Sequence, residues 1–298
     1  MFGPASQAPA TSAPTATPVA AASTPVSGVV GNLSQGRIAF GSERDGNPEI
    51  YLLTSAAPGA NRLTDSPGQD AQPAWSPDGS RIVFSTDRDG ASQIYTMDAD
   101  GSGRKKLSDG RGGDGFPAWS PDGRRVAFAS DRAGNADIYV MNLDGTGVTR
   151  LTSGPDNDLA PSWSPDGGRI VFDRDLGGTD FELFVVNPDG TGETRLTNDP
   201  ASDQAPAWSP DGLRIAFFSD RAGNFEIFTM KADGSDVTRV THDPADDVEP
   251  AWSPDGGQFA FVSTRDGNEE IYVMNVDGTA VVRLTDSPAD DGAPAWSK

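Results

Sequence analysis

Two residue types that build many reactive sites are almost missing from this 298-residue chain, which has no cysteine and a single histidine, His242. The lack of cysteine excludes disulfides, thiol catalysis and zinc–thiolate centres. One histidine cannot supply the histidine clusters of most catalytic metal sites. The chain also lacks the G-x-S-x-G nucleophile motif and the glycine-rich phosphate motifs. These absences argue against an enzyme.

Long apolar runs and positive charge are also scarce. No stretch is long enough to cross a membrane, and no basic segment followed by an apolar run marks a signal peptide. The 23 lysines and arginines are outnumbered by 44 acidic residues, giving a net charge of −21. Nucleic-acid binding needs clustered basic residues, so we expect no nucleic-acid partner and no direct membrane insertion. The acidic surface is expected to attract cations and basic proteins.

The first 35 residues differ from the rest. They carry no charged side chain and are rich in Ala, Pro, Ser and Thr, a composition that predicts a disordered or semi-extended tether. Similar spacers often separate a membrane or lipid anchor from an exported domain. We therefore expect residues 1–35 to be a tether, residues 36–298 to be the folded domain, and the location to be periplasmic or at the cell surface.

The folded region is rich in glycine (35 residues) and proline (24 residues), and it is built on a repeat. P-A-W-S-P-D-G first occurs at 73–79 and returns with little change. Every tryptophan of the chain lies in this motif, at intervals of 44, 44, 45, 44 and 44 residues. One residue type confined to one phase of one period indicates a repeat architecture. The six tryptophans are Trp75, Trp119, Trp163, Trp208, Trp252 and Trp296.

Each repeat predicts four short antiparallel strands. P-A-W-S is followed by the S-P-D-G turn, a strand ending in Phe, a D-R-x-G-N-like turn, a strand similar to I-Y-V-M, an x-x-D-G turn and a strand similar to R-L-T. Four such strands in 44 residues make one propeller blade. The first blade has no P-A-W-S of its own, and a last copy at 294–297 has nothing after it. We therefore predict an all-β, six-bladed β-propeller whose C-terminal strand completes the first blade and closes the ring.

These motifs resemble the TolB-type propeller repeat, a WD-like family of bacterial propellers. The resemblance rests on P-A-W-S-P-D-G, I-A-F, S-D-R-x-G-N, I-Y-V-M, D-G and R-L-T, and it covers about 36–298. It implies a six-bladed propeller used mainly for protein–protein association in the cell envelope.

An aspartate stands five residues before every tryptophan. The inner strand of each blade lines the axis of a propeller, so we expect these carboxylates to surround one mouth of the channel. Unit charges about 8–10 Å apart repel by roughly 0.5 kcal/mol in water and more inside a protein. Oxygen ligands favour Ca²⁺, with Mg²⁺ as the second choice. The predicted metal ligands are Asp70, Asp114, Asp158, Asp203, Asp247 and Asp291.

Two alternatives stay open for these aspartates. Each could accept backbone N–H groups in the loop that enters P-A-W-S, and would then recur because the loop recurs. The S-D-R acids and bases, for example Asp87 and Arg88, are expected to pin neighbouring blades. The fourth repeat lacks the base, having Leu176, and the sixth lacks the acid, having Thr264.

The sequence thus predicts a non-enzymatic, monomeric binding or scaffold propeller. Its partner would be a protein or peptide with a basic segment, and a metal cation would be a second ligand. The competing hypothesis is a carbohydrate-active or other hydrolytic enzyme that uses channel carboxylates. Such enzymes need two acids in unequal environments, which six symmetric aspartates do not provide.

Overall fold

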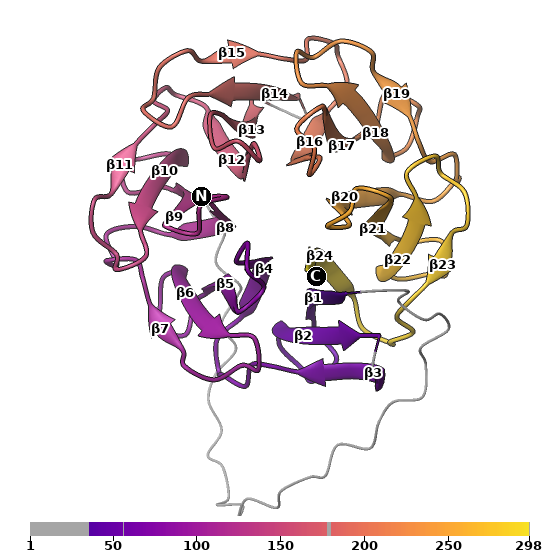
Figure 1. Cartoon of the computed structure of the whole chain (residues 1–298), viewed down its shortest axis with the longest axis horizontal. Coiled ribbons are helices and arrows are strands. Elements are labelled where there is room, and N and C mark those ends of the chain that lie inside the picture. Colours follow the sequence, from indigo (N-terminus) through magenta and orange to yellow (C-terminus); the bar gives the residue numbers. More distant parts are fainter. Residues whose placement is uncertain (1–35, 56, 178–179, 298) are drawn as a thin grey trace, which may run out of the picture.

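The computed structural model describes residues 36–55, 57–177 and 180–297. In this part of the chain six separate four-stranded antiparallel sheets surround a central axis (Figure 1). No helix in the described residues is long and apolar enough to cross a membrane. The tether expected at residues 1–35 lies outside the described residues.

The strands follow the chain in order around the ring, four to a blade. Blade 1 contains β24 (Asp291–Ser297), β1 (Arg37–Ser42), β2 (Glu49–Thr54) and β3 (Ala57–Arg62). Blade 2 contains β4 (Asp70–Trp75), β5 (Arg81–Thr86), β6 (Gln93–Asp98) and β7 (Lys105–Lys106). Blade 3 contains β8 (Asp114–Trp119), β9 (Arg125–Ser130), β10 (Asp137–Asn142) and β11 (Thr149–Arg150). Blade 4 contains β12 (Asn157–Trp163), β13 (Ile170–Asp175), β14 (Phe181–Val186) and β15 (Thr194–Arg195). Blade 5 contains β16 (Asp203–Trp208), β17 (Arg214–Ser219), β18 (Glu226–Lys231) and β19 (Thr238–Arg239). Blade 6 contains β20 (Asp247–Trp252), β21 (Gln258–Ser263), β22 (Glu270–Asn275) and β23 (Val282–Arg283).

The ring is closed by the C-terminal strand, as the incomplete first and last repeats predict. β24 pairs antiparallel with β1, with Ile38 opposite Trp296 and Ala39 opposite Ala295. In Figure 1 the yellow strand β24 lies beside the indigo strand β1. The first blade thereby gains its inner strand, and β1 does not remain an open sheet edge. Both the six-bladed architecture and its closure are confirmed.

The outer strands differ from expectation. They were predicted at R-L-T, but the outer strands of blades 2 to 6 are only two residues long and end at the basic residue of that motif, as β11 does at Arg150. The threonine lies beyond the strand, because its hydroxyl has another role: in blade 1, Thr64 Oγ1 accepts the N–H of Ile50 at 2.8 Å. Blade 1 has a longer outer strand, β3, which begins at Ala57.

The core lies between neighbouring blades. The phenylalanine in the second strand of each repeat is fully buried, as Phe84 and Phe128 show. Phe84 and Met97 of blade 2 pack with Ala39 and Leu52 of blade 1 in one apolar cluster. Burying a phenylalanine contributes roughly 1.5–3 kcal/mol. Each blade therefore needs its neighbours to cover its faces, which explains why the repeat folds as a ring.

Candidate functional site

The six inner strands enclose a central cavity of about 500 Å³. Its wall repeats the proline of P-A-W-S from every blade and the following alanine from five of them, with Ser162 in blade 4, so the lining is largely apolar. Glu249 is the one acidic residue among those that line it, and Gln72 adds an amide. Of the described residues, therefore, only one carboxylate faces the cavity.

A bulge shapes this wall. In every inner strand the residue before the proline has a positive φ, between 46° and 54°, although none of the six is glycine. The register shifts at the same place, for example between Ala71 and Ala74 in blade 2. Six strained residues at one repeat position indicate that the surrounding ring determines their conformation. They are Gln72, Phe116, Ala160, Ala205, Glu249 and Ala293.

Side chains from the preceding blade hold three of these bulges. Gln72 Oε1 accepts the N–H of Phe116 at 2.8 Å, and Glu249 Oε2 accepts the N–H of Ala293 at 2.6 Å. In blade 4, Asp173 Oδ2 accepts the N–H of Ala205 at 2.9 Å. Burial raises the pKa of Glu249, and this hydrogen bond opposes the shift. These two acids and one amide thus join blade to blade.

The six aspartates predicted as metal ligands occupy equivalent places at the start of the inner strands. Each lies in an inner strand, at its first residue in five blades and its second in blade 4, and each is at most 1% exposed. None is among the residues that line the central cavity, and all six are buried within their blades. Each forms an ion pair with an arginine of its own blade. The pairs are Asp70–Arg88, Asp114–Arg132, Asp158–Arg174, Asp203–Arg221, Asp247–Arg265 and Asp291–Arg44.

Each arginine of this set is held from several sides. Arg88 donates to both oxygens of Asp70 at 2.9 and 2.7 Å and, through Nε, to the hydroxyl of Thr86 at 3.1 Å. Its guanidinium also lies over the rings of Phe84 and Tyr95, 5.6 and 5.0 Å from their centroids. Removing one partner of such a buried pair costs about 3–5 kcal/mol, because the other charge stays buried.

Burial and the arginines act in opposite directions on these carboxylates. Burial raises the pKa of Asp203 and Asp247, while hydrogen bonds and ion pairs with Arg221 and Arg265 limit the rise. The same balance holds for Asp158 and Asp291, whose pKa values are also raised by burial. These aspartates are therefore buried, ion-paired parts of the interior of their blades.

Blade 4 keeps the ion pair by moving its base. Leu176 stands where the other repeats have arginine, but Arg174, two residues earlier in β13, reaches the same carboxylate. Its Nε and Nη2 donate to Asp158 at 2.6 and 2.9 Å. Arg174 lies directly opposite Asp158 in the sheet, so its side chain is on the same face. Arg174 thus takes the place of the arginine that is absent at position 176.

The S-D-R acids hold their own blade rather than its neighbour, which corrects the expectation. Asp87 Oδ1 accepts the N–H of Gln69 at 2.7 Å, just before the inner strand of the same blade. In blade 6, Thr264 Oγ1 accepts the N–H of Asp246 at 3.2 Å in the equivalent place. Acid and base of the turn together fix the start of the inner strand.

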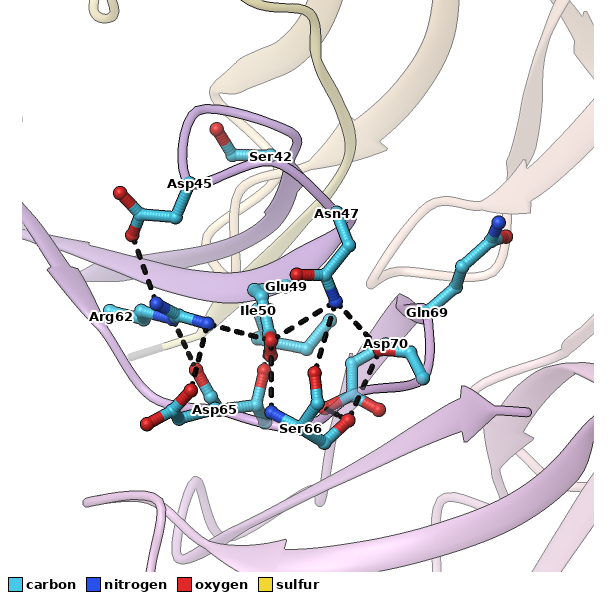
Figure 2. A network of polar contacts seen from close by, with 12 residues as sticks. Ser42, Asp45, Asn47, Glu49, Ile50, Arg62, Asp65, Ser66, Gln69 and Asp70 are labelled. Atoms are coloured by element: carbon cyan, nitrogen blue, oxygen red, sulfur yellow. Dashed lines mark hydrogen bonds and ion pairs between the residues drawn. The ribbon is translucent and has the colours of Figure 1, made fainter. Parts of the chain in front are cut away.

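A second set of buried ion pairs was not found by sequence reasoning. Figure 2 shows the blade 1 example, in which Arg62 Nη2 lies 2.7 Å from Glu49 Oε1 and the N–H of Ser66 donates to the same oxygen at 2.9 Å. A recurring acid before I-Y-V-M and the arginine of R-L-T, 13 residues later, could have revealed it. The pairs are Glu49–Arg62, Asp137–Arg150, Glu182–Arg195, Glu226–Arg239 and Glu270–Arg283.

Blade 2 changes both members of this second pair together. It has Gln93 in place of the acid and Lys106 in place of the arginine, and Lys106 pairs with Asp89 at the surface at 3.1 Å. Blade 3 has the shorter Asp137, which is fully buried, and burial raises its pKa to about 6. At this position, therefore, each blade keeps its acid and base paired or replaces both.

The residues that the structure describes contain no preformed metal site. No three acidic or histidine side chains there come together in a way that could hold a metal ion. His242 is exposed on a loop. Calcium binding by the six aspartates stays a prediction, and their ion pairs favour a structural role instead.

The fold and its repeated polar contacts define a six-bladed β-propeller. The chain matches the model of the TolB beta propeller domain at residues 34–110, 101–181 and 177–249, well over half of its length. It therefore belongs to the TolB β-propeller family. No curated protein sequence matches the chain.

Solved structures share the fold at low sequence identity. The crystal structure of TolB from Acinetobacter baumannii has a TM-score of 0.76 and 23% identity, over 90% of this chain and 68% of that one. A chain of a nidogen/laminin complex has a TM-score of 0.72 and 10% identity, over 88% and 98% of the two chains. An oligogalacturonate lyase in complex with manganese has a TM-score of 0.60 and 17% identity, over 84% and 74%.

Proposed function

We propose that this protein is a non-enzymatic binding or scaffold propeller that docks a protein with a basic segment, outside the cytoplasm. The observation that carries the proposal is where the charges lie. Eleven arginines of the described residues are paired with eleven buried carboxylates, in the two sets described above. These pairs are neutral, so the net charge of −21 lies outside them.

An acidic outer surface steers a basic partner and suppresses acidic ones. The comparisons also support protein binding, since TolB belongs to the family and a chain from a nidogen/laminin complex shares the fold. A monomer has two loop-rich faces available for such a contact. Location in the periplasm or at the cell surface is part of the proposal and rests on the family and on the composition of residues 1–35.

The test is capture of partners from an envelope fraction by the immobilised full chain at low and high salt. We expect proteins with a basic segment, whose capture falls as salt rises because exposed charges are screened over about 10 Å at 0.1 M. Capture that is absent, or independent of salt, would overturn the proposal.

Calcium is the second ligand to test. The ion pairs lead us to expect that calcium and EDTA leave the unfolding temperature unchanged, since metal binding would require six arginines to release their aspartates. Calorimetry and thermal unfolding measure this directly. A saturable heat with a raised unfolding temperature, lost in Asp114→Asn, would support calcium (or magnesium) as a ligand of these residues.

A hydrolytic enzyme is the second candidate function, and Glu249 is the residue that favours it. Glu249 lines the cavity, and its carboxylate and that of Glu269 both approach Gly292. Burial, followed by the charge of Glu249, raises the pKa of Glu269. A screen of glycan substrates with the wild type and Glu249→Gln separates the two functions: turnover that disappears in the variant would establish the enzyme.

A further inference from the structure

A groove of about 460 Å³ opens between blades 5 and 6. It lies on the tryptophan face, the face formed by the S-P-D-G and x-x-D-G turns. Trp252 forms part of its wall, and Leu213 and Val276 stand at its edge with 66% and 38% of their surfaces exposed. Exposed apolar side chains beside a half-buried tryptophan are typical of a contact surface.

Other blades show what occupies the same position beside their tryptophans. An arginine stands at or just before the start of the second strand in five blades, and in three of them it lies over the tryptophan of the next blade. Three guanidinium groups lie over indole rings in this way, 4.4–4.8 Å from the ring centroid. Stacking of a guanidinium on an indole contributes about 0.5–2 kcal/mol. The stacked pairs are Arg37–Trp75, Arg125–Trp163 and Arg169–Trp208.

At the groove the equivalent arginine points elsewhere. Arg214 donates through Nη2 to Asp236 Oδ2 at 2.8 Å and through Nη1 to Thr229 Oγ1 at 3.3 Å. It lines the groove together with Trp252 but does not stack on it among the described contacts. The groove therefore opens where the other blades place a guanidinium.

Two other interfaces lack the stacked arginine: blade 6 has Gln258 at this position, next to Trp296 of blade 1, and blade 2 has Arg81, next to Trp119 of blade 3. Arg81 faces Asp98 at 3.7 Å instead of stacking on Trp119. Trp119 is nevertheless only 8% exposed and lies in the apolar core between its blades. Trp252 is more exposed than Trp119 and forms a wall of the groove, so its indole is accessible to a partner.

Acidic residues complete the groove. Asp211, Asp255 and Asp277 line it. Each uses Oδ1 within its own turn, as Asp255 does for Ser253 and Gly257, and no described residue donates a hydrogen bond to Oδ2. These hydrogen bonds hold the pKa of each carboxyl below its ordinary value, so all three are charged at neutral pH.

We propose that this groove binds an arginine side chain of a partner protein, with the guanidinium stacked on Trp252 and apolar neighbours of that arginine on Leu213 and Val276. The proposal rests on the proposed function and names the contact for it. Arginine is favoured over lysine because its planar group both stacks and donates to carboxylates. The protein itself uses arginine at three equivalent positions.

The experiment uses the ¹⁵N-labelled full chain, whose six tryptophans give six indole N–H signals. The probe is an acetylated and amidated tripeptide, Leu-Arg-Leu, and the matched control peptide is Leu-Gln-Leu. We expect one indole signal to shift saturably with the arginine peptide. The glutamine peptide should bind with an affinity lower by about tenfold. Trp252→Phe identifies the signal, which should be the one that disappears.

Two further variants use the protein's own arginines. Asp236→Asn releases Arg214, which should then cover Trp252 and abolish the shift. Arg169→Ala uncovers Trp208 in the neighbouring blade, and a second indole signal should then respond to the peptide. Asp236 is exposed, so its loss is not expected to affect folding.

Each outcome decides the proposal. No shift in the wild type, a shift of a signal other than that of Trp252, or an equal response to both peptides would overturn it. Binding that survives Asp236→Asn would also overturn it. If the wild type and Trp252→Phe capture the same salt-sensitive partner equally well, the groove is not the contact, while the binding function of the propeller stands.

Discussion

Asp173 gives the sharpest test of how the propeller interior treats charge. It follows the buried Phe172 in β13, and the equivalent residues of the other blades are uncharged, such as Ser85 and Ala129. Asp173 is 4% exposed, and its Oδ1 has no hydrogen-bond partner among the described residues. Burial raises its pKa to about 7, and the hydrogen bond from the N–H of Ala205 only partly opposes this.

The direction of the pH effect follows from this raised pKa. The folded protein binds the proton below about pH 7, whereas the unfolded chain releases it near the ordinary value of 3.8. At low pH the Asp173 carboxyl is neutral and does not destabilise the folded protein. As the pH rises through about 7 the buried carboxyl ionises, and the free energy of unfolding falls. A shift of about three pKa units corresponds to about 4 kcal/mol at 1.36 kcal/mol per unit.

The perturbation is Asp173→Asn, which keeps the shape and removes the titration. The amide has a fixed hydrogen-bonding cost at every pH, so the informative quantity is the difference between variant and wild type at two pH values. Urea unfolding followed by tryptophan fluorescence gives this difference at pH 5 and pH 8. We expect the variant to gain about 3 kcal/mol relative to wild type between these values.

Asp65→Asn is the control, because the Asp65 side chain is 89% exposed. It should change the pH dependence little. If Asp173→Asn shows the same difference from wild type at pH 5 and pH 8, the carboxyl titrates normally and the reasoning from burial is refuted.

Three further variants test the ion pairs and the ring closure. Arg221→Ala should lower the free energy of unfolding by about 3–5 kcal/mol, measured by urea unfolding, because its aspartate stays buried and charged. Arg174→Ser should cost a similar amount, and adding Leu176→Arg should recover most of it by restoring the arrangement of the other blades. Cysteines placed at Ala39 and Ala295 should form a disulfide across the closing strand pair, visible as a mobility change without reductant, and raise stability by up to about 5 kcal/mol.

The controls for these variants use residues of the same types. Arg111→Ala removes an arginine whose side chain is 80% exposed and should change stability by less than about 0.5 kcal/mol. An equal loss in Arg221→Ala and Arg111→Ala would contradict the role of the buried pair. A Leu176→Arg addition that recovers nothing would contradict the relocated base. Failure of the two cysteines to oxidise would contradict the register of β24 on β1.

The ring was predictable because the sequence itself repeats. A tryptophan every 44 or 45 residues and turns such as S-P-D-G specify four short strands per repeat, whichever side chains lie between them. The complementary ends at Arg37 and Trp296 specify closure for the same reason. The outer strands were less predictable, because two residues such as Thr149 and Arg150 have no periodicity to detect.

The role of the six aspartates could not be predicted in the same way. Their recurrence at one phase was visible, but their arginine partners lie 18 residues later in most blades and 16 residues later in blade 4. Only the sheet register brings Asp158 opposite Arg174. The second set of pairs was missed because an acid before a buried strand resembles the polar end of any strand.

By itself the sequence determined the number of blades, the order of strands and the closure of the ring, because turn residues and buried aromatics act locally and repeat. The tertiary structure alone decided which charges are neutralised in the interior and which remain outside. It also decided that Arg214 turns to Asp236 while three equivalent arginines cover tryptophans. The choice of partner depends on contacts within and between blades, and local sequence does not encode such contacts.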